Sequence, residues 1–173
     1  MGEIVRRSGA GGPPAQPPSF EGFERIAAAL ADVREVAAIA REPSPELLAR
    51  IDQAIKLVEQ QRAVIQGAAA PAARGSVGGY LALLMKAYTN SGMQDSKVFG
   101  RLMLEDVMSM EPTIAAVEIA CRQWRRSSKF LPAISELLVE VKAAKSQVDN
   151  TVEFIERLPA LRERIARDLG ESA

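Results

Sequence analysis

Apolar residues recur every three or four positions over a long stretch in the C-terminal half of the chain. In this stretch they are Ile134, Leu137, Val141, Ala144, Val148, Val152 and Ile155. This spacing places them along one face of an α-helix, whereas a half-buried strand requires strict alternation of apolar and polar residues. No part of the sequence shows that alternation. We therefore expect an all-α fold.

Similar apolar stripes predict two helices near the N-terminus. The first is expected over 20–41 and the second after the sequence EPSPELL, where Ser44 suits the N-cap and Pro45 the first helical position. The stripes have heptad-like spacing and comprise Phe23, Ile26, Leu30, Val33, Ala37 and Ala40, then Leu47, Ile51, Ala54, Val58 and Ile65. The short connection predicts an antiparallel hairpin over 20–66. Because two helices bury little alone, this hairpin is expected to pair with another copy, the rest of the chain or a partner.

Glycine and proline suggest where the chain divides. The Gly- and Pro-rich residues 1–19 are expected to form a disordered tail, because ordering costs about 1–2 kcal/mol per residue with no apolar gain. The sequence GAAAPAARGSVGG at 67–79 predicts a flexible linker and a domain boundary. A helical domain is expected over 80–158. Proline kinks or ends a helix, so a separate C-terminal helix is expected over 159–173.

The composition offers little for catalysis. The chain has 173 residues, no histidine and one cysteine, so the commonest general base is missing and no disulfide or paired-cysteine metal site can form within it. The sequence motifs of nucleotide-binding loops, serine hydrolases and zinc proteases are also absent. Cys121 shares an apolar stripe with Ile114 and Val117 and is expected in the core. We therefore expect a protein that is not an enzyme and uses no cofactor or metal.

The charge balance gives no overall attraction to nucleic acids or membranes. Lys plus Arg and Asp plus Glu both number 22, so such attraction requires a local patch. No apolar run approaches the roughly 20 residues that cross a bilayer. The N-terminus has no apolar segment typical of a signal peptide. We expect a cytoplasmic protein without membrane contact.

One local cluster of cations departs from this neutrality. Arg122, Arg125, Arg126 and Lys129 lie within eight residues of one another, at and just before the start of the sequence WRRSSKFLPAISELL. The next helix is predicted to begin directly after them. Cations beside a helix N-terminus are able to bind the phosphates of DNA or another anion. The same cations also suit the negative end of the preceding helix, where each contributes about 0.3–1 kcal/mol. The sequence leaves both interpretations open.

The span from about 80 to 141 resembles a known family. A short helix LLMKAY, a helix SKVFGRLMLEDV capped by Asp95 or Ser96, a helix TIAAVEIACRQW and the corner RRSSKFLPAISELL follow one another. This order resembles the small helical domain of the replicative-helicase loader and inhibitor group of phage replication proteins. The residues that match its motif are Ala116, Val117, Ser128, Phe130, Leu131, Pro132, Ile134 and Glu136. In this arrangement Phe130 and Leu131 are expected to pack the corner, Pro132 to start the last core helix and Trp124 to anchor the core.

The resemblance implies an accessory protein of phage or prophage DNA replication, acting in the cytoplasm of a bacterial host. Its partner would be a hexameric replicative helicase, which it loads or inhibits. The matched residues are structural, so the resemblance assigns no residue to partner binding. Two alternatives of other classes stay open: a DNA-binding protein that uses the basic corner, and a structural homo-oligomer held by coiled-coil packing of the hairpin and the last helix.

Overall fold

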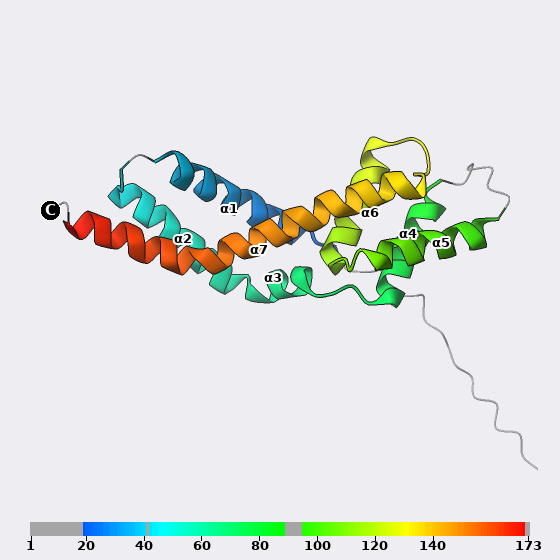
Figure 1. The fold of residues 1–173 in the computed structure, drawn as a ribbon, viewed down its shortest axis with the longest axis horizontal. Helices are drawn as coiled ribbons and strands as arrows, with labels where there is room; N and C mark the ends of the chain where they lie inside the picture. Colours follow the sequence, from blue (N-terminus) through cyan, green and yellow to red (C-terminus); the bar gives the residue numbers. More distant parts are fainter. Residues whose placement is uncertain (1–18, 41, 89–94, 172–173) are drawn as a thin grey trace, which may run out of the picture.

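A computed structural model of the protein describes residues 19–40, 42–88 and 95–171. The described residues form an elongated all-α fold, which confirms the expected class (Figure 1). Its helices are α1 (Glu21–Ile39), α2 (Pro45–Gln60), α3 (Arg62–Ala69), α4 (Arg74–Lys86), α5 (Ser96–Ser109), α6 (Ile114–Ser127) and α7 (Ile134–Glu171). The tail expected over 1–19 lies outside the described residues except for Ser19.

The long helix α7 packs against both halves of the molecule (Figure 1). Its 38 residues correspond to a length of about 57 Å. Leu137, Val141 and Val148 are fully buried in a core shared with α4, α5 and α6. Leu158 and Ile165 are buried in a second core with α1 and α2. The apolar stripe of the sequence thus supplies one side of two successive cores.

The N-terminal helices α1 and α2 form the expected antiparallel hairpin (Figure 1). The Ser44 hydroxyl accepts a hydrogen bond of 3.2 Å from the backbone N–H of Leu47, so the expected N-cap is present. Leu30 of α1 and Ile51 of α2 are buried with Leu158 of α7. Of the three expected ways to cover the hairpin, the structure therefore uses the rest of the chain.

The segment 67–79 connects the hairpin to the later helices, as expected, and part of it is helical and buried. Helix α3 ends and α4 begins inside it, and Ala68, Ala72 and Val77 are buried. The Ala72 N–H donates to the Pro112 carbonyl at 2.9 Å. Each helical glycine costs about 1 kcal/mol relative to alanine. Burial of the apolar residues between the glycines offsets that cost, so the segment packs into the fold.

Helix α7 also differs from the prediction at Pro159, where we expected a separate element to begin. The helix continues through Pro159 to its end. The proline is exposed and has no N–H to donate to the carbonyl one turn earlier. Leu158 and Ile165 on either side are buried in the second core. Their burial holds the two parts of α7 together as one element.

Replacing Pro159 with alanine is expected to raise the free energy of unfolding by about 1–3 kcal/mol. Alanine restores a backbone N–H to the helix and has the highest helix propensity. Urea unfolding followed by far-UV circular dichroism measures the change. Ala160→Gly, at the exposed neighbouring position, is the control and is expected to lower the stability by about 1 kcal/mol. A less stable Pro159→Ala variant would show that core packing depends on the proline.

Candidate functional site

Helix α6 forms the centre of the first core and leads to the basic corner. Its N-cap is Thr113, whose hydroxyl accepts a hydrogen bond of 3.3 Å from the Ala116 N–H. All residues over 115–122 are buried, including the motif residues Ala116 and Val117. Its C-cap is Ser128, whose N–H donates to the Trp124 carbonyl at 2.9 Å. The orientation of the corner is therefore fixed by a helix with little exposed surface.

Arg122 does not belong to a basic surface, because carboxylates enclose it. Its side chain is 9% exposed and donates to Glu118 Oε1 at 2.8 Å and to Glu24 Oε2 at 2.6 Å. The hydrogen bond with Glu118 is the main cause that raises the pKa of Arg122. The backbone N–H of Phe20 donates to the other Glu118 oxygen at 3.4 Å. Arg122 therefore joins α1 to α6, and its guanidinium is not exposed on the surface as the predicted contact with DNA or another anion requires.

The other three cations of the predicted cluster are exposed, but they are not equivalent. Arg126 donates to Oε1 of Glu21, the first residue of α1, at 2.9 Å. Arg125 and Lys129 form no ion pair within the described part of the chain. The positive patch predicted from four residues therefore reduces to two uncompensated cations and one that is partly neutralised.

Hydrogen bonds hold the backbone of the loop 128–133 between α6 and α7. The indole N–H of Trp124 donates to the Phe130 carbonyl at 2.8 Å. The Ser128 hydroxyl accepts from the Phe130 N–H at 3.2 Å and lies 3.1 Å from the Phe130 carbonyl. The Tyr88 hydroxyl donates to the Ser128 carbonyl at 3.1 Å. Both the N–H and the carbonyl of Phe130 thus have partners.

The end of the same loop is fixed to α7. The Glu136 carboxylate accepts a hydrogen bond of 2.8 Å from the Ala133 N–H, as in a capping box. Pro132 is buried, Leu131 is half-buried against the first core and Ile134 packs beside it. Leu131 and Ile134 thus pack on the core, whereas Pro132 lies two positions before the first residue of α7 and does not start that helix as expected. Trp124 also packs on this core, as expected, and its N–H has the additional role of holding the loop.

Phe130 is placed differently from the prediction, because it does not pack the corner. Its side chain is 79% exposed, the highest value among the large apolar residues on the described surface. The adjacent Leu131 and Pro132 occupy the space over the core. The loop therefore presents an aromatic ring to solvent beside Lys129 and close in sequence to Arg125. We take this loop with its flanking cations as the candidate functional site and call it the Phe130 corner.

Cys121 lies in the core, as its place on the apolar stripe indicated. The thiol is fully buried. Burial is the main cause that raises its pKa to about 12. A thiol that remains protonated and enclosed is a poor nucleophile at neutral pH.

The described residues contain neither a candidate metal site nor a candidate membrane span. No three or more acidic or cysteine side chains gather there in a way that could hold a metal ion. No described helix is long and apolar enough to cross a membrane. Comparisons of the chain with protein-family models, curated proteins and solved structures find no match.

Replacing Arg122 with alanine is expected to lower the free energy of unfolding by about 3 kcal/mol, because the Glu118 charge is left buried without a partner. Arg125→Ala removes an exposed cation of the same helix and is expected to change the stability by less than about 0.5 kcal/mol. Urea unfolding of both variants measures the difference. Equal stabilities for the two variants would contradict the role of Arg122 in joining α1 to α6.

The raised pKa of the buried Cys121 thiol predicts that the folded protein loses stability at alkaline pH. The unfolded chain releases the Cys121 proton near the ordinary pKa of 9.0, while the folded chain holds it to about 12. This contribution is therefore complete below pH 9 and is lost as the pH rises, by about 1 kcal/mol at pH 10. Unfolding curves of the wild type and Cys121→Ala, measured over this pH range, isolate the effect. Parallel pH profiles would contradict it.

Proposed function

We propose that this protein is a non-enzymatic adaptor that docks on a protein partner through the Phe130 corner. The exposed Phe130 ring on a hydrogen-bonded loop is the observation that carries the proposal. Burying a phenylalanine side chain stabilises a fold by about 1.5–3 kcal/mol. In this protein the Phe130 side chain stays exposed, although Leu131 and Pro132 directly after it pack against the fold. A partner with an apolar pocket would recover it on binding.

The fixed backbone of the loop supports an anchoring role. Loops that order only on binding lose conformational entropy, which weakens the complex. Here both backbone polar groups of Phe130 already have partners, from Trp124 and Ser128. Aromatic residues in such preorganised positions are frequent among the few side chains that dominate binding energy.

The charges at the corner indicate an acidic partner surface. Arg125 and Lys129 are exposed without an ion pair in the described part of the chain. Cations at the rim of an interface mainly increase the association rate and select partners of opposite charge. An apolar pocket bordered by carboxylates therefore fits the Phe130 corner best.

A replicative helicase in a bacterial host is the partner that we propose, on the basis of the resemblance over about 80–141. The Phe130 corner belongs to that span. Docking of a rigid helical face would favour one assembly state of a hexameric ring over another. The protein would then load or inhibit the helicase without any chemical step of its own.

DNA binding is the weaker candidate, because few cations are available for it. Each neutralised phosphate contributes about −0.9 to the slope of log affinity against log salt. The two unpaired cations of the corner would give a slope of about −1.8. Proteins that bind DNA through many phosphates have a much steeper salt dependence. Assembly of copies through the hairpin is also less favoured, since α7 already covers the apolar face of that hairpin.

Replacing Phe130 with alanine is expected to reduce partner retention by about thirtyfold, which corresponds to roughly 2 kcal/mol. The tagged wild type and variant are used to capture proteins from a bacterial lysate with and without nuclease treatment, and the helicase is quantified by mass spectrometry. Val139→Ala is the matched control, because Val139 is also exposed but lies on α7 outside the corner.

The controls separate this role from the alternatives. Equal helicase retention by the Phe130→Ala and wild-type proteins would contradict docking through Phe130. A partner that is lost on nuclease treatment would favour the DNA-binding alternative. Circular dichroism is expected to show unchanged folding for both variants, because neither side chain is buried.

A further inference from the structure

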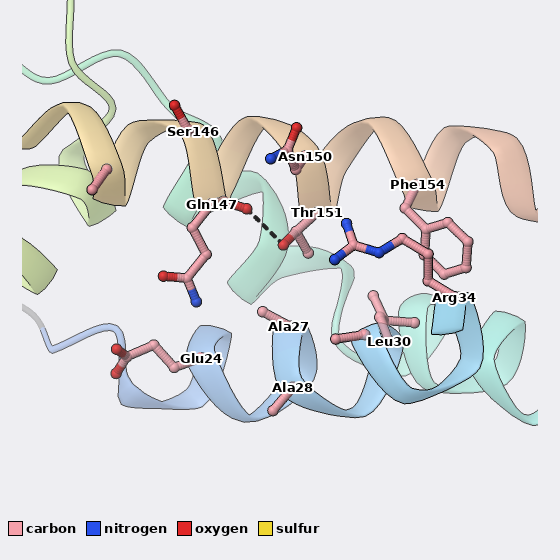
Figure 2. A pocket seen from close by; sticks show the side chains of 12 residues that line it. Glu24, Ala27, Ala28, Leu30, Arg34, Ser146, Gln147, Asn150, Thr151 and Phe154 are labelled. Carbon is pink, nitrogen blue, oxygen red and sulfur yellow. Dashed lines mark hydrogen bonds between the residues drawn. The ribbon is translucent and has the colours of Figure 1, made fainter. Parts of the chain in front are cut away.

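A groove between α1 and α7 forms a second candidate site, separate from the Phe130 corner (Figure 2). Its volume is about 410 Å³, which lies within the range of ligand-binding clefts. Small side chains on both helices leave this space open, namely Ala27, Ala28 and Ala31 on α1 and Ala143 and Ser146 on α7. Leu30 and Phe154 add larger apolar surface to its lining.

The polar groups of the groove differ between its two ends. At one end, Glu24 is already bound by Arg122 at 2.6 Å. Toward the other end, Arg34 extends from α1 toward α7 beside Phe154, and Gln147 points from α7 toward α1 (Figure 2). Within the described residues, neither the Arg34 guanidinium nor the Gln147 carboxamide has a hydrogen bond or ion pair. The groove therefore has one cation without an ion pair, and the carboxamides of Gln147 and Asn150 have no hydrogen bond within the described residues.

The dimensions of the groove suit a short extended peptide. Glu24 and Arg34 are ten positions apart on α1, which corresponds to about 15 Å. An extended chain rises about 3.3 Å per residue, so four or five residues would span this distance. The alanines of the lining leave room for small side chains of such a peptide.

We propose that the groove binds an extended peptide segment of a partner protein that carries an acidic side chain. The guanidinium of Arg34 is suited to bind a carboxylate through two hydrogen bonds. The Gln147 carboxamide can both donate to and accept from a peptide backbone. Arg34 is the single cation among the described residues that line the groove, and it favours an acidic segment over a basic one. Glu24 shares Arg122 with Glu118, so the acidic side chain is placed at the Arg34 end of the groove. This site is independent of the Phe130 corner.

Binding is tested with the full-length, ¹⁵N-labelled protein and two pools of pentapeptides that are acetylated and amidated at their ends. One pool has glutamate fixed at the central position and the other has lysine. The glutamate pool is expected to shift the NMR signals of the Gln147 side-chain amide and the Arg34 Nε–H, and the lysine pool is expected to leave them unchanged. Blocked termini ensure that the glutamate side chain is the only fixed carboxylate.

Variants of two arginines on α1 assign the effect to the groove. Arg34→Gln is expected to weaken binding of the glutamate pool at least tenfold. Arg25→Gln removes the same charge from an exposed position of α1 that does not line the groove, and it is expected to bind like the wild type. The proposal is overturned if the glutamate pool shifts no groove signal, if the lysine pool shifts them equally, or if Arg34→Gln binds unchanged.

Discussion

The shared face of α7 is the constraint on which the rest of the structure depends. Its apolar stripe is buried against α6 and neighbouring helices in its first half and against the hairpin in its second half. Helix α1 also contributes to both cores, through Phe23 and Leu30. The buried cluster of Arg122, Glu118 and Glu24 then joins α1 to α6. The hairpin and the later helices are thereby packed together along one long helix.

The position of the Phe130 corner follows from this arrangement. Helices α6 and α7 pack against each other over the first core, so the chain must reverse direction within the loop 128–133. Leu131 and Pro132 turn inward during this reversal, and Phe130 remains outside. Hydrogen bonds from Trp124, Ser128 and Tyr88 hold the loop. The packing that builds the fold thus also fixes the ring that we propose as the anchor.

Local patterns in the sequence predicted the helices, the Ser44 cap and the buried position of Cys121, because these depend on neighbouring residues. The burial of Arg122 between Glu118 and Glu24 was not predictable in this way. Glu118 lies one helical turn before it, but Glu24 is 98 positions away. The exposure of Phe130 and the packing of 67–79 also depend on distant contacts. The groove between α1 and α7 has no sequence signal, since alanines on both helices are equally typical of closely packed helices.

The proposed role of Phe130 is tested most directly by replacing it, in cells of the bacterial host, with the photo-reactive residue benzoylphenylalanine. This residue resembles phenylalanine in shape, and the exposed position has room for it. Irradiation is expected to join position 130 to a replicative helicase, at a surface that contains acidic residues. The same photo-reactive residue at exposed position 139 is expected to give no such product. Absence of the product at 130, or equal yields at both positions, would contradict docking through the corner.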